Sequence, residues 1–253
     1  MGAELTSVLA LAAIAVLVGF FIGSVGVGGV LLIPPLVWLG GLGIHVAAST
    51  ALLTFFFTGL FGTWLFHRRG SIDWRMTVPV CVGAVVFSYL GALVSSTIDA
   101  RVLALIVAAI IVFAGIYVLL PSRREEGNYR KGGDSTERLL LLGVGAAAGF
   151  GSGLSGVGGA LFSVPMMMVL GFVPLAAIGT SQVLQVVVAF SGTIGNIQFG
   201  SVDFHTAAWI TLFELAGVVL GTRAAHAVSV QALRRMAAGL CIVVGLVMLV
   251  RSL

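Results

Sequence analysis

The chain has 253 residues, of which 59% are hydrophobic and 9% charged, and its formal net charge is +4. Soluble globular domains have about 25% charged residues, so this composition excludes them and predicts an integral membrane protein. The runs between charges are about 18 to 25 residues long, which suits helices that cross a ~30 Å hydrocarbon layer better than the alternating strands of a β-barrel. Most basic residues lie in short loops where they can face lipid headgroups, so nucleic-acid binding is not expected.

The first half of the chain is predicted to contain five membrane elements. Residues 1–21 have the length of a signal peptide, but they lack a basic residue before the apolar core and match the start of the second half, so we interpret them as a retained helix. The next segment, 26–40, contains glycines and prolines and would be roughly 22 Å long as a helix, which is too short to cross comfortably. Three longer segments follow, at 44–66, about 76–94 and 102–120.

A charged stretch at 121–138 is predicted to be a linker outside the membrane, on its cytoplasmic side. It divides the chain into a first membrane repeat at 1–120 and a second at 139–253, which together form one integrated domain. The second repeat is expected to contain a helix at 139–151, a second Gly/Pro segment, and helices at 174–199, 204–221 and 231–253.

The two halves are copies of one another. The stretch GSVGVGGVLLIPPLVWL at 23–39 returns as GLSGVGGALFSVPMMMV at 153–169, and the same shift of 130 positions pairs GSID at 70–73 with GSVD at 200–203. Over the 97 aligned positions nine glycine pairs occur, where composition alone gives about two. The sequence therefore indicates a tandem duplication.

The basic residues indicate how the two copies are oriented. If all five elements of each half cross the membrane, one side receives 11 of the 13 basic residues, whereas re-entrant Gly/Pro segments would give nine against four. The positive-inside rule therefore favours five crossings per half, and an odd number makes the halves inverted. The predicted fold is an all-α integral membrane protein with two inverted repeats of about five elements each and short, Gly/Pro-broken helices near the midplane.

Interrupted Gly/Pro segments at matching positions of inverted repeats are typical of a transport site at the midplane. Glycines let backbone N–H groups turn inward, and the positive end of a short helix favours a small anion with several oxygens. Two alternatives stay open: the glycines only let helices pack closely, and the hydroxyls only bond a carbonyl one turn back. The candidate binding residues are Ser24, Gly26, Gly28, Gly29, Ser49, Thr50, Ser155, Gly156, Gly158, Gly159, Thr180, Ser181, Gln182, Gln185 and Asn196.

Glu214 is the only acidic residue deep inside a predicted helix. A carboxyl group in a membrane is a functional candidate by default, here as a proton carrier for coupling or as the partner of Arg223. A structural pair, or a position at the membrane edge, stays open as the alternative. Cys81 and Cys241 lack CxxC spacing and are interpreted as packing residues.

The two glycine motifs resemble those of the TauE/SafE sulfite exporter family. That family has a pattern similar to G-x-G-G-G-x-L-x-x-P followed by an A-x-G-T-S-like stretch, and here these are GVGGVLLIP with AASTA, and GVGGALFSVP with AIGTS. Val30 and Ala160 stand where a third glycine is usual, and Ala48 to Ala51 replace the Gly-Thr-Ser of the first half. The resemblance implies a secondary transporter of sulfur-containing anions, such as sulfite, sulfonates or sulfoacetate, in the bacterial inner membrane.

Two other functions are compatible with parts of the sequence. An anion channel would share the same architecture. A rhomboid-like serine protease is suggested by GLSG at 153–156, but it would need a histidine base beside Ser155, and it has no need for two copies of its site. We therefore expect no enzyme activity, no cofactor and no metal. The expected partners are the anion, membrane lipid and protons as coupling ion, with a homodimer left open.

Overall fold

The computed structural model describes residues 2–26, 28–119, 134–199 and 202–227, together with isolated positions between 235 and 250. All regular structure in these ranges is helical, so the predicted all-α class is confirmed. The predicted element at 231–253 is described only at isolated positions. Residues 121–133 of the predicted linker lie outside the described ones.

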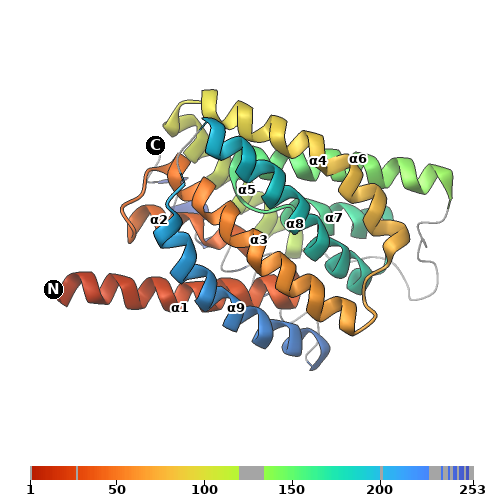
Figure 1. The fold of residues 1–253 in the computed structure, drawn as a ribbon, viewed down its shortest axis with the longest axis horizontal. Helices are drawn as coiled ribbons and strands as arrows, with labels where there is room; N and C mark the ends of the chain where they lie inside the picture. Colours follow the sequence, from red (N-terminus) through yellow and green to blue (C-terminus); the bar gives the residue numbers. More distant parts are fainter. Residues whose placement is uncertain are drawn as a thin grey trace.

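The described elements follow the predicted order (Figure 1). In the first half they are α1 (Gly2–Val25), the 3₁₀-helix η1 (Gly29–Leu31), α2 (Ile33–Trp38), α3 (Ile44–Arg68), α4 (Trp74–Thr97) and α5 (Ala100–Leu119). In the second half they are α6 (Ser135–Ser155), α7 (Ala160–Leu170), α8 (Pro174–Phe199) and α9 (Phe204–Ala227).

Six of the described helices are long and apolar enough to cross a membrane, namely α1, α3, α4, α6, α8 and α9. The chain is therefore a multi-pass membrane protein. The two Gly/Pro segments form shorter apolar helices, Gly29–Trp38 and Ala160–Leu170, as their length predicts. Both are preceded by a glycine with positive φ at the same place in the repeat, Gly26 at 78° and Gly156 at 69°. Only glycine adopts this conformation without strain, so each long helix ends there and the chain turns into the short one.

Some predicted boundaries are wrong: α6 ends at Ser155 and not at residue 151, and α9 ends at Ala227 and not at residue 221. Helix α6 begins at Ser135, inside the stretch predicted as linker, and not at residue 139. The Asp134 side chain accepts a hydrogen bond from the Ser135 N–H at 2.8 Å, and Glu137 lies in the first turn. Both acidic groups stabilise the positive end of a helix. The polar residues just before residue 139, which were predicted as linker, therefore form the first turn of α6.

Helices α1 and α9 pack along their lengths through glycines. Gly19 lies against the backbone of Glu214, and Gly23 lies one turn further along, against Val218. Since both contacts advance in the same direction along the two chains, α1 and α9 are parallel. A side chain at either glycine would overlap the facing main chain, which is how small residues let membrane helices approach closely.

Helices α4 and α6 make the same kind of interface. Gly145 lies against Val80 and Gly149 lies against Ala84, so these two helices are parallel as well. Under the repeat shift of 130 residues, α9 is the equivalent of α4, and α6 is the equivalent of α1. The two interfaces are therefore one arrangement of helices that occurs twice.

The centre of the molecule is formed by α3 and α8, which lie side by side in Figure 1. Gly62 contacts Gln182 while Leu52, ten residues earlier, contacts Gly192, ten residues later, so α3 and α8 are antiparallel. Two hydrogen bonds join α4 and α8, between Thr77 and Thr180 and between Ser88 and Val188, and they advance in the same direction along both helices. Thr50 of α3 binds Asp203, just before α9, and Arg69, just after α3, binds Thr222 of α9, so α3 and α9 are parallel as well. Helices α1, α3 and α9 therefore point one way, and α4, α6 and α8 point the other way.

Candidate functional site

The two interrupted segments meet in the middle of the protein. A Cβ atom at Gly29 would lie 2.7 Å from the carbonyl oxygen of Val157, which belongs to the glycine motif of the other half. Gly156 lies against Ala48 of α3, and a Cβ atom at Gly26 would lie 3.0 Å from the Ser181 hydroxyl of α8. Each motif therefore packs against the central helix of the opposite half. Because the contacts are so close, these glycines serve packing in this conformation.

The short helices begin at this junction without side-chain caps. Helix α7 begins after Gly159, and η1 begins after Gly28. Glycine has no side chain, so neither helix start is capped by a side-chain hydrogen bond. The first N–H groups of such a helix have no partner within the helix and attract negative charge. The arrangement can therefore offer backbone donors to an anion that reaches the junction.

Two buried glutamines of α8 connect the halves at the same level. The Gln182 Nε2 group donates to the carbonyl of Ile22 in α1 at 3.0 Å. The Gln185 Nε2 group donates to the Phe55 carbonyl at 3.3 Å and to the Thr58 hydroxyl at 3.2 Å, both in α3. Each glutamine thus binds the backbone of the first half from a helix of the second.

Several polar atoms at this junction are buried without a hydrogen-bond partner. They are the Ser24, Ser152 and Ser163 hydroxyls and the Oε1 atom of Gln182. A buried polar group without a partner costs about 1–3 kcal/mol, and native proteins keep few of them. The three serines lie within four residues of a motif glycine along the chain, and unpartnered groups of this kind can bind a polar ligand.

Glu214, on α9, is fully buried, and neither of its carboxyl oxygens has a hydrogen-bond partner in the described structure. Thr54 of α3 lies beside the carboxyl group, but its hydroxyl donates to the Ala51 carbonyl at 2.9 Å. Arg223 lies nine residues further along α9, about 13 Å away along the axis, and its side chain is exposed. The structure therefore does not bring Arg223 to Glu214.

Other candidate residues make their hydrogen bonds outside the two glycine motifs. The Thr50 hydroxyl accepts from the Asp203 N–H at 3.0 Å, and the Thr180 hydroxyl is 2.9 Å from that of Thr77. Because α3 and α8 are antiparallel, and each threonine lies near the start of its helix, these two contacts are at opposite ends of the protein. Ser49 adjoins Thr50, and Asn196 is 11 residues from Gln185, about 16 Å along α8.

The Ser155 hydroxyl donates to the Gly151 carbonyl at 2.6 Å, one turn back in its own helix. This is the ordinary alternative expected for a serine in a membrane helix. The Ser181 hydroxyl does the same with Ile178 at 2.7 Å. Neither hydroxyl is bonded to a histidine in the part of the chain that the structure describes.

The loop before α9 contains one group with a perturbed pKa. The Asp203 carboxylate accepts from the Thr206 hydroxyl at 2.7 Å and from the Thr206 N–H at 3.0 Å. These hydrogen bonds stabilise the ionised form and lower the pKa of Asp203 below its usual value. Asp203 therefore stays charged at the start of α9 and fixes its first turn.

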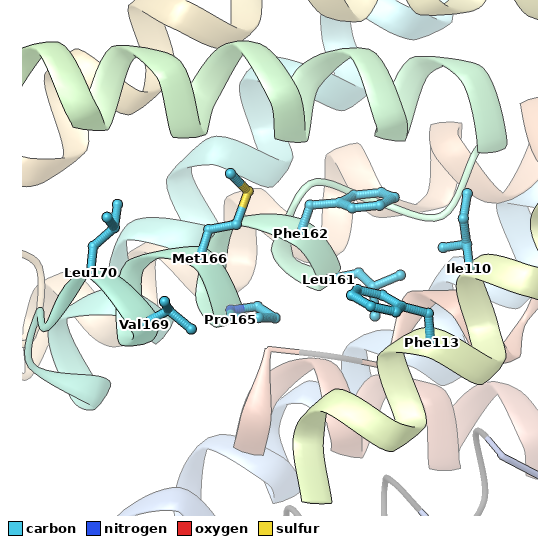
Figure 2. A pocket seen from close by; sticks show the side chains of 8 residues that line it. All are labelled: Ile110, Phe113, Leu161, Phe162, Pro165, Met166, Val169 and Leu170. Atoms are coloured by element: carbon cyan, nitrogen blue, oxygen red, sulfur yellow. The ribbon is translucent and has the colours of Figure 1, made fainter. Parts of the chain in front are cut away.

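A cavity of about 400 Å³ lies outside this junction, between α5 and α7. Figure 2 shows that its wall is made of apolar side chains, among them Ile110 and Phe113 of α5 and Leu161, Phe162 and Met166 of α7. Such a wall offers no hydrogen-bond donor to an anion. This cavity is therefore not a candidate for the anion site.

Two threonines of α3 belong to the polar centre but were not among the residues predicted for it. Thr58 accepts the hydrogen bond from Gln185, and Thr54 lies beside Glu214. The only signal in the sequence is their spacing of four residues, which puts them on one face of a helix. Their repeat partners are Leu184 and Val188, so the duplication does not single them out.

Comparison with known proteins covers nearly the whole chain. The family model described as sulfite exporter TauE/SafE matches residues 11–248. The probable membrane transporter protein YdhB of Bacillus subtilis is 30% identical over 212 residues, which are 82% of this chain and 86% of that protein.

Two further relatives are matched over a larger share of their length. The probable membrane transporter protein YjnA of Bacillus subtilis is 24% identical, with 90% of this chain and 94% of that protein covered. A probable membrane transporter protein of Methanocaldococcus jannaschii is 26% identical, with 92% and 94% covered. No solved structure has significant similarity to the chain.

Proposed function

Because the chain belongs to the sulfite exporter TauE/SafE family of membrane transporters, we propose that it moves a small sulfur-containing anion across the bacterial inner membrane. The substrate class is sulfite, a sulfonate or sulfoacetate. The anion binds where the two interrupted segments meet, between the halves. The observation on which this rests is the contact of Gly29 in one glycine motif with Val157 in the other.

The mechanism is alternating access by two inverted repeats. Helices in equivalent places of the two halves point in opposite directions: α1 against α6, α3 against α8, and α4 against α9. Inverted repeats that meet at a central site can exchange conformations, so that the site opens first to one side and then to the other. The closely packed glycines at the junction represent a conformation in which the site is closed.

The binding groups are neutral. Among the described buried side chains there is no Lys, Arg or His, so a bound anion would be held by hydrogen bonds and helix dipoles. The donors in this proposal are the first N–H groups of α7, the Ser24 hydroxyl and the amides of Gln182 and Gln185. An anion with three oxygens on a sulfur atom can accept several hydrogen bonds from such donors.

The proposed orientation follows the basic residues. The turn from α3 into α4 carries Arg68 at the end of α3, Arg69 in the loop and Arg75 at the start of α4, whereas the equivalent turn from α8 into α9 carries only His205, at the start of α9. By the positive-inside rule the first loop lies in the cytoplasm, together with the charged linker between the halves.

The test is transport by the full chain in liposomes, with a panel of radiolabelled sulfite, sulfate, sulfoacetate, taurine, isethionate and acetate. Ser24→Ala removes a buried hydroxyl that has no partner, so the fold loses no hydrogen bond. If this hydroxyl binds the anion, the variant loses about 1.5–3 kcal/mol of binding, and KM rises roughly 10- to 100-fold.

Thr193→Val is the matched control, because Thr193 is also a buried hydroxyl without a partner. It lies eight residues after Gln185, about 12 Å along α8, and should leave KM within about two-fold. Failure of every sulfur anion to move would refute the substrate class. Equal changes in both variants would refute the location of the site.

A further inference from the structure

Glu214 has surroundings that are unusual for a carboxyl group. It is the only acidic or basic side chain that is fully buried among the described residues, and both its oxygens lack hydrogen-bond partners. It lies in the middle of α9, nine residues after His205 and nine before Arg223. The group is therefore near the centre of the membrane and shielded from water.

Among the described residues, no charged group faces Glu214 from the helices packed against it. On α3, Thr54 lies beside it, whereas His45 is nine residues from Thr54 and His67 and Arg68 are 13 and 14 residues away, so each is more than about 13 Å distant along the axis. On α1, Gly19 is the contact, and the only ionisable residue of that helix, Glu4, is 15 residues earlier.

The same holds on α9 itself, where the ionisable residues His205, Arg223 and His226 lie toward the two ends of the helix. An ionised carboxylate without a partner is strongly disfavoured in an apolar interior. In this conformation Glu214 is therefore a neutral carboxylic acid that holds a proton.

A line of polar groups leads from Glu214 toward the proposed anion site. Thr54 lies beside the carboxyl group, and the Thr58 hydroxyl, one turn further along α3, donates to the Thr54 carbonyl at 3.2 Å. The Gln185 amide donates in turn to the Thr58 hydroxyl at 3.2 Å. A small shift of α3 relative to α8 and α9 would therefore change the contacts of both Glu214 and the proposed anion site.

The surroundings suit a proton better than a metal cation. No group of three His, Cys, Asp or Glu side chains occurs among the described residues. Helices α3 and α9 are continuous at this level, so their carbonyls are used within the helices and are not free to coordinate an ion. Coupling-ion sites for Na⁺ usually use carbonyls of unwound helices, which this position does not have.

We propose that Glu214 is the proton-binding group that couples transport to the proton gradient, as a symporter. This rests on the proposed anion transport. With the anion bound, Glu214 is protonated, because a carboxylate and an anion in one low-dielectric interior repel each other. On the release side the acid gives its proton to water and becomes a carboxylate, and on the other side the carboxylate takes a proton from water before the next anion binds.

The first test uses Glu214→Gln, which keeps the shape of the side chain and can take up no proton. The full chain is reconstituted in liposomes with whichever of sulfite, sulfoacetate and isethionate it exchanges fastest. In the wild type, an exterior one pH unit more acidic than the interior should drive accumulation of the labelled anion toward about ten times its outside concentration, since symport of one proton per anion converts one pH unit into a factor of ten. In Glu214→Gln this accumulation should vanish, while exchange of labelled for unlabelled anion across the membrane continues.

The matched control is Thr211→Val, one turn earlier on α9. It removes a hydroxyl that bonds only to the Ala207 carbonyl of the same helix, at 2.7 Å. This variant should accumulate the anion as the wild type does. Accumulation by Glu214→Gln equal to that of the wild type would overturn the proposal.

A second measurement separates proton binding from transport. The infrared spectrum of the reconstituted protein should contain a band of a protonated carboxyl group at neutral pH, and Glu214→Gln should lack it. If no sulfur anion moves but the band is present, the proposed substrate is wrong and the proton site stands. If the wild type lacks the band, Glu214 does not hold a proton and the inference fails.

Discussion

Close contact between α4 and α6 predicts that Gly145 tolerates no side chain. A Cβ atom at this position would overlap the Val80 carbonyl, which is main chain and cannot turn away. Overpacking of this kind costs about 1–3 kcal/mol. Alanine also favours a helix over glycine by about 0.5–1 kcal/mol, and this gain offsets part of the cost.

Gly143 of the same helix provides the control that separates these two effects. It is exposed, and nothing lies within 4 Å of a Cβ atom there. Gly143→Ala therefore gains helix stability without any packing cost. The difference between the two variants then measures the packing cost alone, about 1–3 kcal/mol, which is roughly 3–10 °C in Tm for a chain of this size.

Tm is measured on the purified proteins in one detergent, at one heating rate, by tryptophan fluorescence. Gly145→Ala should unfold below the wild type and Gly143→Ala at or above it. Gly217→Ala, which faces Val16 in the α1–α9 interface, should behave as Gly145→Ala does, because the two interfaces are built alike. Equal Tm values for the Gly145 and Gly143 variants would show that the helices are not in backbone contact.

Two further predictions concern single side chains. Replacing Gln185 with leucine removes hydrogen bonds to Phe55 and Thr58. This variant should have a free energy of unfolding lower by about 1–2 kcal/mol and should exchange the anion more slowly. An unchanged exchange rate would show that Gln185 is not part of the anion site. Hydrogen bonds from Thr206 lower the pKa of Asp203, so its contribution to stability is present above the unfolded-state pKa of about 4 and is lost as pH falls through the lower folded-state value. Asp203→Asn should abolish this loss, and parallel Tm curves of wild type and variant below about pH 4 would contradict it.

The membrane class, the helix order and the two short helices could be predicted from the sequence because each depends on local physics. The length of an apolar run decides whether a helix can cross the membrane. Gly26 and Gly156 end long helices because positive φ favours glycine, whatever lies around them. The start of α6 was missed, since Asp134 reads equally well as linker and as a helix cap.

The composition of the polar centre could be predicted only in part. The glutamines of α8 stood out because amides facing lipid are costly. Thr54 and Thr58 did not, because a threonine in a helix can satisfy its hydroxyl on a carbonyl one turn back, as both do here. Their contact with Glu214 and Gln185 depends on α8 and α9 lying against α3, and no local pattern encodes that.

The sequence by itself determined that this protein is a membrane-embedded duplication with a glycine-rich break in each half, since these features depend on composition, segment length and repetition. Only the tertiary structure decided that Thr50 and Thr180 lie at opposite ends, and that Glu214 is buried apart from Arg223. The physical reason is that the directions and contacts of helices far apart in the chain arise from packing between glycine-lined backbones.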